Sequence, residues 1–310
     1  MKRRNSRMCP APVNPLASSA RAPRHAPPIT RHPAGFTLIE LLVVISIIGI
    51  LAALSVPALK NLGKSNVAVG ASRQLLDDLA RARQLAMSQH TTVYMVFVKT
   101  NFWMAPSFPT PNPWWLKLTP AQKTAATNLC DKQLTGYAFL SLRSVGDQPG
   151  RGAARYLGPW HNLPDGTFIA SRKFQAPTAL PFYISVADPK SPIYQTPIYG
   201  FNTTNTFPFP TEDSPTSSLL VLPYIAFNYL GQLTTDGQSI AKFDEFIPLA
   251  QGSVSPAIDG TTKALVLTLT PGGSASISET PPGNSTNSMH NVIHIDRLTG
   301  RATLEYQRVQ

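Results

Sequence analysis

The chain has 310 residues, and its 43% hydrophobic content is enough for a packed core, which excludes a wholly disordered chain. The net charge of +11 is typical of nucleic-acid-binding proteins, but seven basic residues and no acidic residue lie within 1–35. Without these seven charges the remainder carries +4, an ordinary value for a globular domain, so the charge does not by itself predict a nucleic-acid partner.

Residues 1–35 form a basic, proline-rich segment. We expect it to stay on the cytoplasmic side of a membrane, because basic residues beside an apolar helix set its orientation. The segment contains Cys9, and Cys130 is the other cysteine of the chain. If the segment is removed as a leader, Cys130 has no partner for an intrachain disulfide, and packing must stabilise the domain.

The next segment, 36–59, contains 24 residues with a single charged side chain, that of Glu40. About 20 consecutive apolar residues span a bilayer as a helix, so this segment predicts a membrane-spanning helix with the C-terminal domain in the periplasm. A secretory signal has a shorter apolar region of roughly 7–15 residues and does not need a carboxylate. A carboxylate in the membrane costs on the order of 3 kcal/mol and by default has a function.

The run GFTLIELLVVI, which begins at Gly35, resembles the N-terminal cleavage and methylation motif of type IV prepilins and type II secretion pseudopilins. The resemblance implies that prepilin peptidase, a membrane aspartyl peptidase, cuts between Gly35 and Phe36 and methylates the new amino group of Phe36. It also implies that Glu40 pairs with the Phe36 amino group of a neighbouring subunit during assembly. A buried carboxylate needs such a positive partner. The leader is long for this family, so Met8 is a candidate start.

Pro57 would be residue 22 of the mature chain, where pilins often carry a proline. Within a helix, proline removes a backbone donor and permits a bend, so Pro57 is interpreted as a helix kink. The alternative is that Pro57 marks the end of the helix near Lys60.

Residues 60–90 predict an amphipathic continuation of this helix. Apolar side chains recur at three- and four-residue intervals, whereas charged and polar side chains fall on other faces. The apolar stripe consists of Val67, Ala71, Leu75, Leu79, Ala82 and Ala86. We expect the stripe to pack against a sheet, as in the layout of a pilin.

Residues 91–310 predict a β-rich periplasmic head. Runs of β-branched and aromatic residues indicate strands at 91–98, 136–143, 166–170, 182–186, 224–229, 264–270, 291–296 and 302–306. The last two are joined by Arg297-Leu298-Thr299-Gly300-Arg301, a hairpin signal. The proline-rich stretches 101–120 and 177–223 are interpreted as loops. The predicted fold is α+β and pilin-like, with a long N-terminal α-helix packed on one antiparallel β-sheet or on two.

Three further segments resemble the minor pseudopilins of type II secretion (protein H) and the related pilus-biogenesis protein T. They are 160–168 with a Leu-Pro-x-Gly turn, 227–231 with a Phe-x-x-x-Gly spacing, and 292–304 with a Gly-Arg pair at Gly300-Arg301. Tyr156 and the loop 146–150, together with the proline-rich excess length, resemble the prepilin-like cassette D proteins of Verrucomicrobia (Verru_Chthon).

Residues suited to catalysis or metal binding do not form a recognisable motif. His290 and His294 have a spacing that suits a metal site on a helix, but they fall in a predicted strand, where four residues span about 13 Å. Nucleophile, zincin and phosphate-loop motifs are missing, so no catalytic residue, metal or cofactor is assigned. The aromatic segment 102–116 is either a docking surface or a cover for the core, and the second interpretation is favoured.

The favoured hypothesis is a structural minor pseudopilin or pilin subunit and not an enzyme. Its partners would be prepilin peptidase, the inner membrane, and other pilin or pseudopilin subunits that it contacts through the N-terminal helix in a periplasmic or extracellular filament. The alternative is a pilus-tip module that binds DNA or a surface, which a basic face around Arg297, Arg301 and Arg308 would favour. The third class is a single-pass anchored periplasmic enzyme, which would require a polar cleft with convergent titratable groups.

Overall fold

The computed structural model describes residues 37–104, 113–143, 146–147, 152–176, 181–188, 191–213, 219–262, 265, 275–285 and 291–306. Within these ranges, 54–66, 113, 182–188, 191–196 and 306 are described by their backbone alone. The chain divides into two units, Met1–Ser55 and Val56–Gln310, and each is described by itself.

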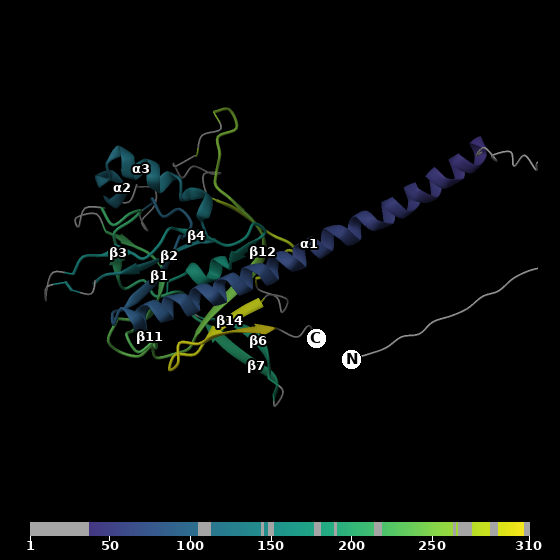
Figure 1. Ribbon diagram of the computed structural model, residues 1–310. Coiled ribbons are helices and arrows are strands. Elements are labelled where there is room, and N and C mark those ends of the chain that lie inside the picture. Colours follow the sequence, from purple (N-terminus) through teal and green to yellow (C-terminus); the bar gives the residue numbers. More distant parts are fainter. Residues whose placement is uncertain are drawn as a thin grey trace, which may run out of the picture. The chain divides into compact units, whose positions relative to one another are not determined.

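The longest element is helix α1, Leu38–Ser88, which begins in the first unit and ends in the second. Within the second unit, Figure 1 shows the last part of α1 lying along a group of strands. The other helices are α2 (Pro113–Lys117) and α3 (Pro120–Thr127), with short 3-10 turns at Cys130–Lys132 and Ser171–Phe174.

Two antiparallel sheets form most of the head. The first has the strand order β11-β10-β1-β2-β3, with β4 paired to β2, and the second has the order β13-β12-β14-β15, with β5 paired to β12. The strands of the first sheet are β1 (Val93–Phe97), β2 (Gly136–Ser141), β3 (Arg155–Tyr156), β4 (His161–Asn162), β10 (Tyr224–Phe227) and β11 (Leu233–Thr234). Those of the second are β5 (Thr167–Ile169), β12 (Glu245–Ser255), β13 (Ser276–Glu279), β14 (Asn291–Ile295) and β15 (Ala302–Tyr306).

Two separate hairpins complete the described strands. They pair β6 (Phe182–Asp188) with β7 (Ser191–Ile198), and β8 (Thr206–Phe207) with β9 (Leu220–Val221). The N-terminal helix packs on antiparallel sheets, so the α+β prediction is confirmed, in its two-sheet form, and the arrangement is consistent with a pilin-like fold.

One hydrophobic core, here called the helix core, joins α1 to both sheets. The predicted stripe residues Ala71, Leu75, Leu79, Ala82 and Ala86 are all 0% exposed. They pack with side chains from β1, β2, β10, β12 and β14. The predicted packing of this part of the helix on a sheet is therefore confirmed, and three of its six stripe positions are alanine, whose small side chain lets the helix backbone approach the sheets closely.

A second core lies on the opposite face of the first sheet. Successive side chains of a strand point to opposite faces, so Val93, Met95 and Phe97 enter the helix core, whereas Tyr94 and Val96 enter the second core. The cover over that second face comes from α2, α3 and the β8–β9 hairpin. Every residue of β1 is consequently buried, which explains its uninterrupted hydrophobic sequence.

The second core corrects the interpretation of the proline-rich stretches as loops. The stretch 101–120 contains α2, and Phe102, Trp103 and Trp114 are at most 3% exposed. The stretch 177–223 contains β6 to β9. Proline limits these elements in length, but the aromatic residues between the prolines still fill the core, so the favoured interpretation of the aromatic segment as a core cover is confirmed for these three side chains.

Seven of the eight predicted strands are present, and eight further strands of the described chain were not predicted, of which β12 is the longest. The predicted segment 264–270 lies outside the described residues except for Leu265, which forms a bridge with Ile258. This longest unpredicted strand, β12, is the central strand of the second sheet. It contains Pro248 and Gly252, residue types that usually indicate a strand end, yet the Pro248 carbonyl accepts the N–H of Ala170 at 3.0 Å.

Candidate processing and assembly site

The N-terminal end of α1 is stabilised by Thr37. Its hydroxyl oxygen accepts the backbone N–H of Glu40 at 3.3 Å, and its carbonyl accepts the N–H of Leu41 at 3.1 Å. Thr37 is thus the N-cap residue, and Glu40 stands at the third helical position, the spacing of a capping box. This cap explains why the helix begins soon after the predicted cleavage position.

Glu40 lies in the first turn of α1 and is exposed. The unpaired N–H groups of a first turn carry partial positive charge and favour a carboxylate there. Its apolar neighbours Leu38, Ile39 and Leu41 are 83%, 65% and 58% exposed. A lone carboxylate therefore stands among uncovered apolar side chains.

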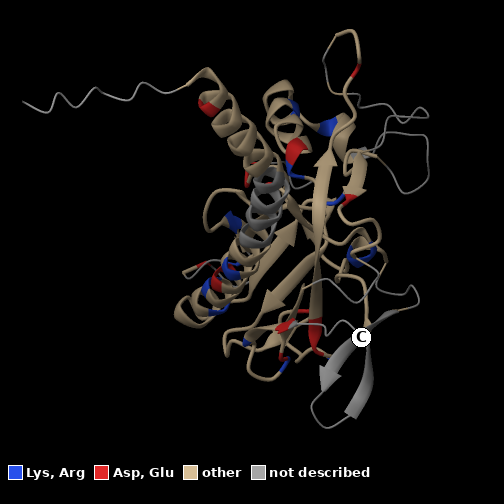
Figure 2. Ribbon diagram, turned by 90° about the vertical axis from the view of Figure 1, so that its right-hand side faces the viewer, with Lys and Arg blue, Asp and Glu red and all other residues tan. Residues whose placement is uncertain are grey.

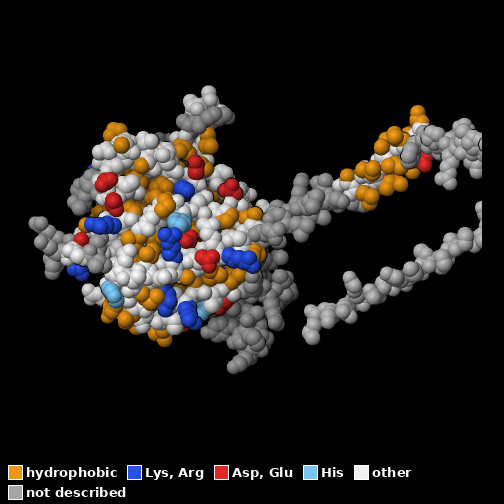
Figure 3. All heavy atoms as spheres, in the orientation of Figure 1, with side chains coloured by type: hydrophobic (Ala, Val, Ile, Leu, Met, Phe, Trp, Pro, Cys, Tyr) orange, Lys and Arg blue, Asp and Glu red, His pale blue; other side chains and the backbone are white. Residues whose placement is uncertain are grey.

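The exposure extends along the whole described part of the apolar run. Each residue of 37–53 is exposed, and Figure 3 shows hydrophobic side chains gathered along this segment with one acidic residue. A helix that is apolar on all sides is stable when lipid or other helices cover it. Among the residues that the structure describes, no helix meets the length and hydropathy required to cross a membrane. The span predicted over 36–59 extends past the described side chains and stays a prediction.

The other predicted site residues are Gly35, Phe36 and Pro57. Gly35 and Phe36 lie outside the described residues. Pro57 is described by its backbone, which is helical there and continues as α1 to Ser88. The alternative that Pro57 ends the helix near Lys60 is therefore wrong, while the kink stays a prediction.

Comparison with known proteins gives one match at this end of the chain. The family model of the prokaryotic N-terminal methylation motif matches residues 30–56, which include Gly35, Phe36 and Glu40. The match supports a type IV prepilin-like protein. No curated protein and no solved structure matches the chain.

The prepilin motif has direct consequences for processing and location. It supports a pilin-like or pseudopilin substrate of prepilin peptidase and implies assembly with other pilins. It is consistent with an inner-membrane-anchored pilin, and it suggests a structural subunit, not an enzyme. The narrower subgroups, including the cassette D proteins, stay predictions.

A polar cluster connects the helix of this prepilin-like chain to the first sheet by hydrogen bonds. The Tyr137 hydroxyl donates to Asp78 Oδ2 at 2.6 Å, and His161 Nδ1 lies 3.3 Å from the same oxygen. Gln74 Nε2 donates to the Tyr137 hydroxyl at 2.9 Å and to the Asn162 carbonyl at 2.8 Å. Burial, together with the hydrogen bond to Asp78, raises the pKa of Tyr137, so its hydroxyl stays protonated. We call Gln74, Asp78, Tyr137 and His161 the Asp78 cluster.

Arg83 fixes the end of the helix to two turns. Its Nε donates to the Thr299 carbonyl at 2.7 Å and to the Gly231 carbonyl at 3.2 Å. Gly300 has a φ of +61°, and a Cβ atom there would collide with the Gly231 carbonyl. The predicted hairpin is confirmed, and Gly300 supplies the positive φ of its turn. Two of the three segments that resemble minor pseudopilins therefore meet at one arginine of α1.

The head contains two ionic groups, one around His294 and one around Lys173. The sequence indicated His294 only as a candidate metal ligand and did not indicate Lys173. His294 lies on β14, 3.1 Å from Asp244 Oδ2 and 2.9 Å from Glu305 Oε1, while His290 is outside the described residues. In the described part of the chain, no group of three His, Cys, Asp or Glu side chains is placed to hold a metal. Lys173 is 1% exposed and donates to Glu245 and to the Tyr199 carbonyl.

The sequence contained a signal for some of these residues. Thr37 and Glu40 have the T-x-x-E spacing of a capping box. Asp78 follows Leu75 by three residues and so falls on the apolar face of the helix, where an acid needs a partner. The partners Tyr137 and His161 come from strands far along the chain, and no local pattern indicates them.

Proposed function

We propose that the chain is a minor pseudopilin or minor pilin, a structural subunit that prepilin peptidase cuts between Gly35 and Phe36 and methylates on Phe36. The observation that carries the proposal is the methylation motif at 30–56, located on a helix whose described first part is apolar and uncovered. The mature subunit would be anchored in the inner membrane by 36–59 and would present the β-rich head to the periplasm.

The exposed first part of α1 supports assembly through this helix. Its described side chains, those of 37–53, are exposed, and contiguous exposed apolar surface of this kind marks a membrane or protein interaction. The second part of the helix has its cover in the head and needs no neighbour. Lipid would cover the first part before assembly, and the helices of neighbouring subunits would cover it in the filament.

Glu40 would then have two partners of different kinds. Within the chain, the first turn of the helix and the Thr37 cap favour a carboxylate. In the filament, the ammonium of Phe36 from a neighbouring subunit would supply the full positive charge that a carboxylate away from water requires. The second role explains why an acid, and not a neutral capping residue, occupies this position.

A role in binding DNA has no specific observation in its favour. Figures 2 and 3 show basic and acidic residues interspersed over the head. Arg297 is engaged with the Lys242 carbonyl and lies 4.0 Å from Asp244, while Arg308 is outside the described residues. Arg301 is exposed, but a single arginine does not form a basic face.

Processing is tested by determining the mature N-terminus. Mass spectrometry of membrane-extracted protein should show a chain that begins at N-methylated Phe36. A mature start near Ala53 or Ala58 would mean that signal peptidase acted, which would overturn the proposal.

The role of Glu40 is tested by comparing three variants at equal levels of processed protein. Glu40→Gln should reduce crosslinking to partner pilins sharply, because glutamine does not attract the neighbouring ammonium, and Glu40→Asp should be intermediate. Thr37→Val removes the cap but keeps the carboxylate, so it should leave crosslinking near the wild-type level. If Thr37→Val reduced crosslinking as much as Glu40→Gln, the acid would be needed only to begin the helix.

A further inference from the structure

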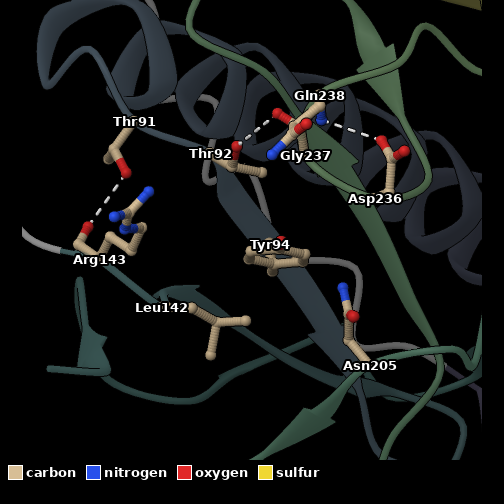
Figure 4. Close-up of a pocket in the computed structure, with 9 residues that line it drawn as sticks. All are labelled: Thr91, Thr92, Tyr94, Leu142, Arg143, Asn205, Asp236, Gly237 and Gln238. Atoms are coloured by element: carbon tan, nitrogen blue, oxygen red, sulfur yellow. Dashed lines mark hydrogen bonds between the residues drawn. The ribbon is translucent and has the colours of Figure 1, made fainter. Parts of the chain in front are cut away.

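A pocket of about 290 Å³ opens at one end of the first sheet, and no residue that lines it belongs to α1. Residues that precede or begin β1, follow β2, precede β8 and follow β11 line it, and Figure 4 shows them around an open space. They are Thr91, Thr92, Tyr94, Leu142, Arg143, Asn205, Asp236, Gly237 and Gln238.

The backbone of Arg143 is held in place while its charged group is not. The Thr91 hydroxyl donates to the Arg143 carbonyl at 3.0 Å, and the Ser141 hydroxyl donates to the same carbonyl. In the described part of the chain, the guanidinium of Arg143 has no hydrogen-bond or ion-pair partner, and the residue is exposed. An arginine whose backbone is already fixed loses less conformational freedom on binding a ligand than an arginine on an unanchored loop.

The acidic group of the pocket is already engaged elsewhere. Asp236 Oδ1 accepts the backbone N–H groups of Gln238 at 2.9 Å and Ser239 at 2.7 Å. These hydrogen bonds lower the pKa of Asp236 to about 2. In Figure 4, Asp236 faces Gln238 and lies across the pocket from Arg143. Asp236 is therefore an ionised group that closes its own turn, and it forms no ion pair with Arg143 across the pocket.

The rest of the wall offers neutral donors and apolar surface. Burial, with the charge of Asp236 and the nearby Tyr224, raises the pKa of Tyr94 to about 12, so its hydroxyl stays protonated. The Asn205 amide lies beside it in the same wall, and Leu142 supplies an apolar side. The Thr92 hydroxyl is already used by the Gly237 carbonyl at 3.2 Å.

We propose that this pocket binds a carboxylate, carried by a small free acid or by an acidic side chain of another polypeptide, with Arg143 as its charged donor. The planar guanidinium matches the two oxygens of a carboxylate in a bidentate pair. A doubly charged phosphate is less suited, because the pocket contains one arginine, while the ionised Asp236 and the nearby C-terminal end of α1 repel two negative charges more strongly than one.

The test is titration of the full-length chain in detergent, followed by NMR or calorimetry. The probes are propionate, its neutral analogue propionamide, inorganic phosphate, and acetyl-Gly-Glu-Gly-amide with its Gln counterpart. We expect saturable binding of at least one carboxylate probe, with a dissociation constant on the order of 1 mM, and weaker binding at high salt. Binding of the Glu peptide alone would identify a polypeptide side chain as the source, and equal binding of propionate would identify a free acid.

Three variants locate the binding. Arg143→Gln should weaken it roughly tenfold or more, and Arg143→Lys should be intermediate, since lysine keeps the charge but loses the planar fork. Arg172→Gln removes an exposed arginine outside the pocket and should change nothing. Melting curves should be equal for all variants. The proposal is overturned if neither acid binds, if propionamide or phosphate binds as well as the acids, or if Arg143→Gln binds like wild type.

Discussion

Leu42 and Leu79 belong to one continuous helix, yet Leu42 is 49% exposed and Leu79 is fully buried. The same contrast holds for acids: Glu40 stands exposed among exposed apolar side chains, whereas Asp78 is buried among hydrogen-bond donors. The second part of α1 finds its cover in the two sheets of the head. The described side chains of the first part, those of 37–53, are all exposed.

Burial within one chain therefore does not follow from hydrophobicity alone. The second part of the helix is amphipathic, so it needs one apolar face covered and leaves residues such as Arg73 and Asp77 in water. The first part is apolar on every side and no single sheet could cover it. Truncation or substitution in the second part should therefore destabilise the head, whereas a substitution in the first part should leave its stability almost unchanged.

The largest effect is expected from truncation. A fragment that begins at residue 66 keeps the stripe residues of α1 and should be soluble, monomeric and cooperatively folded without a disulfide. A fragment that begins at residue 91 lacks the helix, exposes the apolar faces of both sheets, and should aggregate. Size-exclusion chromatography and thermal unfolding compare them. Equal behaviour of the two fragments would show that the helix is not part of the core.

A substitution inside the same helix gives the next effect. Leu79→Ala should lower the free energy of unfolding of the head by about 2–5 kcal/mol, because it leaves a cavity in the helix core. Leu42→Ala is the matched control, and it should change this free energy by less than about 0.5 kcal/mol. Urea unfolding of the full chain in detergent, followed by tryptophan fluorescence, measures both. A comparable loss in the control would mean that the first part of α1 also contributes to the stability of the head.

Two neighbouring acids provide a smaller and sharper comparison. Asp78→Asn should lower the free energy of unfolding by about 1–3 kcal/mol, because it disturbs the hydrogen bonds to Tyr137 and His161. Asp77→Asn alters an exposed acid one residue away and should have an effect within about 0.5 kcal/mol. The same urea titration measures both variants. If both variants lost the same free energy of unfolding, the Asp78 cluster would not be what stabilises the helix on the sheet.

Sequence reasoning predicted the parts of the structure that depend on local patterns. The stripe from Ala71 to Ala86 has helical spacing, and all its predicted members in that range are buried. Seven of the eight predicted strands are present, because β-branched and aromatic residues concentrate in them, but eight other strands of the described chain were not predicted. The T-x-x-E spacing of Thr37 and Glu40 also indicates their capping relation, although Glu40 was interpreted from the sequence only as an assembly residue.

The remainder depends on contacts between distant segments. The strand β12 was missed because Pro248 and Gly252 interrupt its pattern, whereas its pairing with β5 and β14 stabilises it. The second core was missed because proline-rich sequence resembles a loop, while its aromatic residues pack on the far face of the first sheet. The pocket at Arg143 joins four separate segments, so no spacing in the sequence could predict it.

The smallest expected effect concerns pH and lies wholly within the head. Hydrogen bonds to Glu305 and Asp244 raise the pKa of His294 in the folded chain, against the opposing effect of burial. A histidine whose folded pKa lies above its unfolded value of about 6.5 contributes stability that is fully present below that pH. The contribution is lost as the pH rises through the folded pKa.

His294→Gln should therefore remove a pH-dependent stabilisation of less than about 1 kcal/mol, since the three groups are partly exposed. The difference in unfolding free energy between wild type and variant, measured from pH 5 to 9, should be largest at the acidic end and shrink toward pH 9. Both proteins keep the Lys173–Glu245 pair, so its titration cancels in this difference. His90→Gln, which removes an exposed histidine, should give a difference that does not vary in this way. A difference that grew toward pH 9 would mean that His294 is more favourable in its neutral form, and that its two carboxylate neighbours do not hold it as a cation.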